Sequence, residues 1–232
     1  MEDPFSGTSL ADEDGLFAVD LESGQVNKVA SMPQFSGLIP QHNKIDLHYL
    51  NAAKLSATGE RFSVLYKTIP SLEHPHTWNV NAVVGTLDGK ELQRVPLPGN
   101  ASHYWWIDDD RIVYTSNKGR RSDYLVYNCQ TETLTPLTAP APSVDGHPSL
   151  HVPTGRWATD TYPDLCGEQH LYVLSDDMQH RLGQFKASTR YSDECRCDLH
   201  PRWSRDGKSI FFDSTHNGSR AIYRIACDEA GS

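Results

Sequence analysis

Histidine side chains recur at matching places in this sequence, and their spacing suggests a shared site. Four similar segments each begin with one histidine; these are His48, His103, His147 and His200. Imidazoles that gather in one place can bind a divalent metal ion or transfer protons near neutral pH. The sequence therefore predicts a metal or proton-transfer site, provided that the fold brings the starts of the four segments together.

The four segments share a layout of short strands and tight turns. In the clearest copy, the turn Asp206-Gly207 precedes an alternating stretch at 209–214, and Asn217-Gly218 precedes another at 221–225. Asp-Gly and Asn-Gly pairs tolerate the positive φ angles that hairpin turns require. Equivalent turns recur roughly every 45 to 52 residues, a period that suits a four-stranded antiparallel blade. This repeat predicts an all-β propeller.

The propeller is expected to form a single domain over residues 1–232, with about four to five four-stranded antiparallel blades. The expected segments are a partial blade at 15–45, blades at 46–98, 99–140 and 143–190, and a three-stranded last blade at 195–227. Two interpretations stay open. The N-terminal strands complete the last blade and close the ring, or the chain is the C-terminal part of a larger propeller. Open blade edges in the second case would favour a homo-oligomer, because unpaired strands pair readily with another chain.

Composition and charge narrow the range of partners. The net charge of −9 disfavours nucleic acid, which needs a basic surface. No apolar run approaches the roughly 18 residues of a membrane span, so no membrane is expected as a partner. An oligosaccharide or a protein at the mouth of the propeller channel is the expected ligand. The N-terminus lacks the pattern of a secretory signal, which favours the cytoplasm over the periplasm.

The chain contains five cysteines, and an odd number leaves at least one thiol unpaired. Cys195 and Cys197 stand close to His200, and thiolate with imidazole is a ligand combination that suits zinc. The alternative interpretation is that these cysteines are free, buried thiols beside the inner strand of a blade.

Three motifs that a blade does not need for folding resemble a known family. They are DGHPS at 145–149, TDTYPD at 159–164 and RCDLHPRW at 196–203. They resemble the propellers of oligogalacturonate lyases and their relatives, including ulvan lyases. The resemblance covers roughly residues 15–225, and its specific part is 145–220. Because members of that family have about seven blades, this chain looks N-terminally truncated beside them. The blade repeat is also similar to TolB, a periplasmic propeller with no catalytic role.

The resemblance to the lyases implies β-elimination on oligosaccharides that contain uronic acid. The C5 proton needs a base, for which His103 or His147 would serve, and the leaving oxygen needs an acid, for which Tyr162 would serve. Arg196 would neutralise the uronate carboxylate as charge develops. The residues expected to bind substrate are Arg202 and His48.

A divalent metal, zinc or manganese, is expected to assist this chemistry. The expected ligands are His200, Cys197 and Cys195. Asp160 and Asp198 are expected to orient imidazoles through hydrogen bonds. The alternative function is a non-catalytic, TolB-like propeller that binds a protein or glycan. Geometry discriminates the two functions, since the enzyme needs His103, His147, His200 and an arginine within reach of one ligand.

Overall fold

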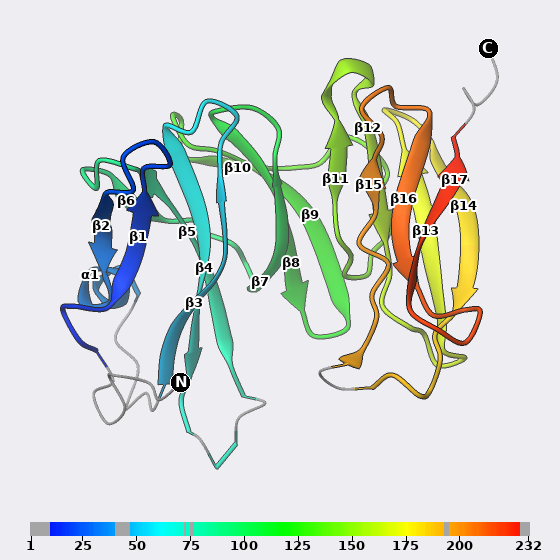
Figure 1. The fold of residues 1–232 in the computed structure, drawn as a ribbon, viewed down its shortest axis with the longest axis horizontal. Helices are drawn as coiled ribbons and strands as arrows, with labels where there is room; N and C mark the ends of the chain where they lie inside the picture. Colours follow the sequence, from blue (N-terminus) through cyan, green and yellow to red (C-terminus); the bar gives the residue numbers. More distant parts are fainter. Residues whose placement is uncertain (1–9, 40–46, 72, 75–76, 193–194, 228–232) are drawn as a thin grey trace. The chain divides into compact units, whose positions relative to one another are not determined.

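The computed structural model describes residues 10–39, 47–71, 73–74, 77–192 and 195–227 (Figure 1). Strands dominate these residues, and consecutive strands pair in antiparallel sheets. The predicted all-β propeller built from antiparallel blades is confirmed. In the described part of the chain no helix is long and apolar enough to cross a membrane.

Three sheets have four strands each, in the up-and-down order of a propeller blade. The first contains β3 (Leu47–Leu55), β4 (Arg61–Ile69), β5 (Asn79–Thr86) and β6 (Leu92–Arg94). The second contains β7 (Asn100–Trp106), β8 (Arg111–Lys118), β9 (Arg121–Asn128) and β10 (Thr133–Pro136). The third contains β11 (Ser149–His151), β12 (Arg156–Asp160), β13 (Glu168–Leu174) and β14 (Gln179–Lys186), with the short helix η1 (Val152–Thr154) between its first two strands.

Two smaller sheets stand at the ends of the described chain. β1 (Gly15–Val19) pairs with β2 (Val26–Ser31), and β15 (Arg202–Trp203), β16 (Ser209–Ser214) and β17 (Ala221–Ala226) form a three-stranded sheet. A short helix, α1 (Met32–Gly37), follows β2. Pro33 fits its first turn, where a missing N–H costs nothing, and its Phe35 side chain is fully buried.

The turns between inner strands use the backbone conformation that their sequence predicts. Gly59, Gly155 and Gly207 have φ angles of 79°, 68° and 67°, in the left-handed region that glycine enters without strain. Each of these glycines joins the first strand of a blade to the second. The repeat in the sequence is therefore a repeat of hairpins that start each blade.

The described chain divides into two compact units. The single domain and the blade bounds expected from the sequence stay predictions. The first unit is Met1–Ala101 with the turns Asp108–Arg111 and Asn128–Thr133, and the second is Ser102–Ile107, Ile112–Tyr127 and Leu134–Ser232. In the first unit, buried side chains of β2, α1, β4 and β5 pack together, Phe35, Phe62 and Val83 among them.

The second unit contains two apolar clusters that join neighbouring blades. Leu171 of β13 packs with Leu199 and with Ile210 of β16, and all three side chains are fully buried. Trp157 of β12 packs with Val113 of β8 in the other cluster. Burial of such side chains contributes roughly 1.5–3 kcal/mol each, so these clusters fix the spacing of the three blades that carry the candidate site.

Candidate active site

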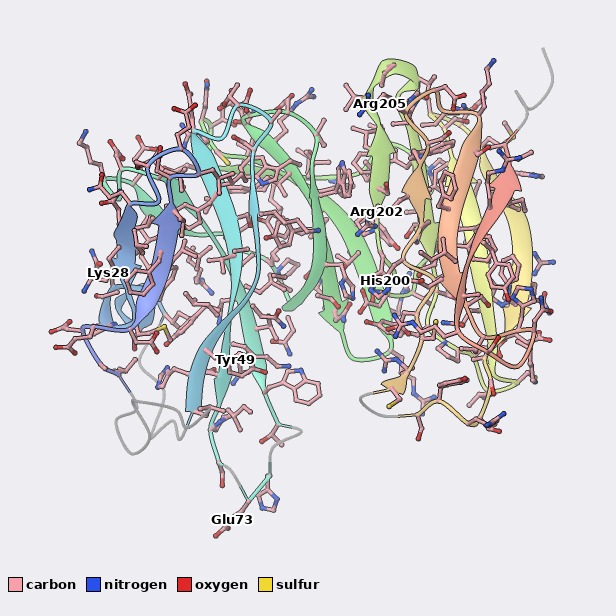
Figure 2. The ribbon with its side chains drawn as sticks, in the orientation of Figure 1. Lys28, Tyr49, Glu73, His200, Arg202 and Arg205 are labelled. Carbon is pink, nitrogen blue, oxygen red and sulfur yellow. The ribbon has the colours of Figure 1, made fainter. Side chains whose placement is uncertain are left out.

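Three of the four repeat-equivalent histidines stand in a row in the second unit. His103 lies on β7, while His147 and His200 lie just before β11 and β15. Ring centroids are 3.9 Å apart between His103 and His147, and also between His147 and His200. Each of three successive blades thus contributes one imidazole. Figure 2 labels His200 on the segment that leads into β15.

His48 belongs to the other compact unit. It lies on β3, where its Nδ1 hydrogen-bonds the hydroxyl of Tyr66 and its ring stacks on the Tyr66 ring with centroids 5.8 Å apart. Burial lowers the pKa of His48, which favours its neutral form. Its expected part in substrate binding stays a prediction.

His147 has one ring nitrogen held by a carboxylate and the other without a partner. Its Nδ1 lies 2.8 and 3.0 Å from the two carboxylate oxygens of Asp160, and the side chain is almost fully buried. An ionised carboxylate only accepts, so Nδ1 carries the hydrogen. Nε2 is then a lone-pair nitrogen, and it is buried with no hydrogen-bond partner among the described residues. A carboxylate on one imidazole nitrogen and a free lone pair on the other is the arrangement of a metal-binding histidine, and also that of a histidine that acts as a general base.

His147 is one of three side chains whose ligand atoms are close enough together to bind one metal ion. Ligand atoms of His147, Asp198 and His200 all lie within 4.8 Å of one another. Two imidazoles with one carboxylate suit zinc or manganese. Burial, and then the neighbouring His200, lower the pKa of His147 to about 3, so its imidazole is neutral at physiological pH. A neutral imidazole is the form that binds metal.

The structure does not bring the two cysteines into this group. Cys197 is buried and its thiol points to the backbone oxygen of Asp198, while Cys195 is exposed. Leu199, two residues after Cys197, is in the apolar core under β16. The side chains of residues 195, 197 and 199 thus alternate with those of Arg196, Asp198 and His200, which reach the site. The thiols expected as ligands are replaced in the described cluster by Asp198 and His147.

Asp198 joins the candidate metal group to an arginine and a tyrosine. Nε and Nη2 of Arg196 each donate to a different oxygen of Asp198, both at 2.9 Å. The Arg196 guanidinium also lies 4.6 Å from the centre of the Tyr162 ring. The hydrogen bonds to Asp198 raise the pKa of Arg196 further. Such a paired fork fixes the direction of both carboxylate oxygens.

His103 and Tyr162 form a hydrogen-bonded pair beside the metal group. Nε2 of His103 lies 2.8 Å from the Tyr162 hydroxyl oxygen. Burial, and then the charge of His147, lower the pKa of His103 to about 4. Burial also raises the pKa of Tyr162 above its ordinary value. Both effects favour the neutral forms, so a neutral imidazole faces a protonated phenol over the whole physiological range.

Arg202 is an exposed cation of this region. It lies on β15, and its guanidinium is 5.3 Å from the centre of the Trp105 ring. One Nη donates to the Pro201 carbonyl, and no carboxylate of the described residues forms an ion pair with it. Figure 2 labels Arg202 on β15, two residues after His200.

Sequence reasoning missed Asp145 as a part of this region. Its Oδ2 accepts hydrogen bonds from the Ser102 hydroxyl at 2.5 Å and from the Asn117 amide at 2.9 Å. Its negative charge acts to raise the pKa of His103, against the larger effect of burial. The signal was its place two residues before His147, in the motif DGHPS, because a carboxylate there is not needed for a blade turn.

Gly146 packs so tightly beside this site that a side chain does not fit. A Cβ at this position would lie 2.0 Å from the Asp160 carbonyl oxygen and 2.8 Å from the Tyr124 hydroxyl. Gly146→Ala is expected to destabilise the protein by about 1–3 kcal/mol, the usual cost of overpacking. Gly37→Ala is the control, since nothing lies within 4 Å of its Cβ. Urea unfolding midpoints measure both changes. Equal midpoints for the two variants would contradict the packing described for Gly146.

Comparisons with solved structures agree with the geometry of the blades. An oligogalacturonate lyase in complex with manganese matches with a TM-score of 0.67 and 19% identity, over 91% of this chain and 54% of that one. An oligogalacturonate lyase from Vibrio parahaemolyticus matches with a TM-score of 0.56 and 16% identity, over 94% of this chain and 73% of that one. A putative TolB from Agrobacterium tumefaciens matches with a TM-score of 0.53 and 16% identity, over 94% and 69%.

No family model matches the sequence, and no curated protein matches it significantly. The chain spans about half the length of the manganese-bound lyase that it resembles. At these levels of identity the likeness carries the fold alone. The chain is therefore a β-propeller whose fold is similar to those of oligogalacturonate lyases and TolB-like proteins.

Proposed function

We propose that this chain carries the catalytic centre of a metal-assisted lyase, which cleaves oligosaccharides of uronic acids by β-elimination. The observation that carries the proposal is the buried, unpartnered Nε2 of His147, which lies in a group with Asp198 and His200. Most buried side-chain nitrogens in folded proteins have a hydrogen-bond partner, so the position of this lone pair beside two other potential ligands supports a metal site. The manganese named with one structural neighbour is consistent with this choice of metal.

The metal would be held by His147, Asp198 and His200. When bound, a divalent ion supplies positive charge that stabilises the negative charge developing on the uronate carboxylate as the C5 proton leaves. Arg196 keeps the Asp198 carboxylate in place through its two hydrogen bonds. The role expected for Arg196 thereby shifts from direct contact with the substrate toward support of a ligand.

The His103–Tyr162 pair can carry the proton through a closed cycle. His103, neutral because burial lowers its pKa, takes the proton from C5 while the C4–O bond breaks and a C4–C5 double bond forms. Tyr162, still protonated, gives its hydroxyl proton to the leaving oxygen. The 2.8 Å hydrogen bond then returns the proton from His103 to Tyr162, which restores both groups. No water is consumed and no other reactant is needed.

Arg202 would bind a carboxylate of the oligosaccharide. Arg202 is an exposed residue, and its guanidinium lies 5.3 Å from the centre of the Trp105 ring. Arginine binds carboxylates through two parallel hydrogen bonds, which neutral sugars cannot accept in the same way. This residue would therefore select acidic over neutral oligosaccharides.

The second candidate function is a propeller that binds a protein or an acidic glycan without cleaving it. The burial of His103 favours it, because burial lowers the pKa of this imidazole to about 4 and makes it a weak base. Arg202 and the metal group would then serve binding alone.

Ultraviolet absorbance of the unsaturated product separates the two functions. The purified protein is incubated with polygalacturonate or ulvan fragments, with manganese or zinc added, and with a chelator in the control. A metal-dependent rise in absorbance is the result that the lyase proposal predicts. Binding of either fragment by calorimetry with no rise in absorbance would support the second function and exclude the first for these substrates.

A further inference from the structure

The carboxylate of Asp160 contacts two of the three candidate metal ligands, and it contacts each of them differently. Asp160 is at the end of β12 and its side chain is fully buried. Its Oδ1 accepts the backbone N–H of His147 at 2.7 Å and faces the Nδ1 of the same residue at 2.8 Å. Its Oδ2 accepts the backbone N–H of His200 at 2.9 Å. One carboxylate thus joins histidines from two blades.

The contact between Asp160 and His200 involves a residue whose backbone conformation is unusual. His200 has a φ angle of 44°, in the left-handed region that residues with a side chain avoid. The following residue is Pro201, which further restricts the backbone before it. Such a conformation persists only where the surroundings hold it, and it occurs most often at functional sites. The hydrogen bond from the His200 N–H to Asp160 is one of the described contacts that hold it.

We infer that Asp160 is the positioning residue that assembles the metal site, since it sets the tautomer of His147 and the backbone of His200 at the same time. Through Nδ1 it leaves the Nε2 lone pair of His147 free for a metal. By accepting the backbone N–H of His200, it fixes the position of the His200 backbone from which the imidazole extends. This inference rests on the metal site of the proposed function, but it does not require that the protein be a lyase.

Asp160→Asn tests the inference with almost no change in shape. A carboxamide has one accepting oxygen, whereas Asp160 accepts through both. If the amide oxygen faces His147, the amide N–H₂ meets the His200 N–H, and two donors oppose each other. If the amide is turned, its N–H₂ opposes the backbone N–H of His147 and favours the tautomer with hydrogen on Nε2. Each orientation damages the site at one ligand.

Asp164→Asn is the matched control. Asp164 also lies in this blade and accepts the backbone N–H groups of Cys166 and Glu168, and its Oδ2 is 3.6 Å from Nε2 of His170. It is exposed and contacts no candidate ligand of the metal group. The control therefore removes one carboxylate beside a histidine without changing the site.

Two measurements on the full chain decide the outcome. Nitrogen-15 NMR of the metal-free protein is expected to show His147 with hydrogen on Nδ1 in the wild type and in Asp164→Asn. Calorimetric titration with Mn(II) alone is expected to show an Mn(II) affinity about 10- to 100-fold lower in Asp160→Asn than in the wild type. Asp160→Ala, which leaves room for water, is expected to lose affinity to a similar degree.

The inference is overturned if folded Asp160→Asn binds Mn(II) within twofold of the wild type, or if His147 of the wild type carries its hydrogen on Nε2. Neither measurement involves an oligosaccharide. A protein that passes both and still cleaves no uronide would contradict the proposed function and leave the role of Asp160 intact.

Discussion

His147→Gln is expected to abolish Mn(II) binding and to reduce lyase activity to background. His147 supplies the buried Nε2 lone pair on which the candidate metal group depends. Glutamine is polar and of similar length, but it cannot place a nitrogen lone pair at that point. We expect Mn(II) affinity to fall by at least about 100-fold, more than for loss of a residue that only supports a ligand. Calorimetry with Mn(II) measures the first effect, and product absorbance measures the second.

His151→Gln is the matched control for this variant. His151 is also a buried histidine of the same blade, with hydrogen bonds to Thr154 and to the Arg205 carbonyl. Its loss should lower stability through the unpaired groups it leaves, while Mn(II) affinity stays close to that of the wild type. Normal Mn(II) binding by folded His147→Gln would show that the metal group is not formed around this residue.

Tyr162→Phe is expected to reduce kcat by about 10²- to 10⁴-fold, the usual contribution of a positioned acid or base. The variant removes the hydroxyl that faces His103 at 2.8 Å, while Arg196 keeps both hydrogen bonds to Asp198, so Mn(II) affinity should change by less than about threefold. Tyr172→Phe is the control, because Tyr172 is a partly buried tyrosine of β13 outside the His103–Tyr162 pair. Retention of more than a third of the wild-type kcat by Tyr162→Phe would contradict the proton cycle.

The same pair predicts the pH dependence of the wild type. Burial lowers the pKa of His103 to about 4, so the base is neutral above that pH and becomes protonated as the pH falls through it. The raised pKa of Tyr162 keeps the acid protonated well into the alkaline range. The value of kcat/KM should be level from about pH 7 to 9. Burial raises the pKa of Asp160 to about 6, so a first decline is expected as the pH falls through that value, and a second as His103 takes up a proton near pH 4. In Asp160→Asn the first decline should be absent, and its persistence there would indicate a solvated histidine as the base.

The fold was predictable from the sequence because residues that favour tight turns recur at a regular spacing. Asp206-Gly207 and Thr154-Gly155 mark positive φ angles, and the alternating stretches that follow became β16 and β12. Strand pairing within a hairpin is local, so the turn sets the register. The convergence of His103, His147 and His200 follows from the same repeat, since equivalent positions of successive blades lie side by side.

The ligand set was not predictable to the same extent, because the segment 195–200 offers two sets at similar spacing. Cys195 and Cys197 stand two residues apart, and so do Asp198 and His200. Which set faces the site depends on packing: Cys197 and Leu199 are buried, and Leu199 is part of the core shared with β13 and β16. The left-handed backbone of His200 could not be foreseen either, because it depends on a hydrogen bond to Asp160, forty residues earlier.

Anomalous diffraction from a crystal of the protein soaked in Mn(II) would show which side chains bind the ion. We expect a manganese peak bonded to Nε2 of His147, at a distance of roughly 2.0–2.3 Å, with Asp198 and His200 as the other protein ligands. A saturating soak that gives no peak there, or a peak held by other residues, would contradict this expectation.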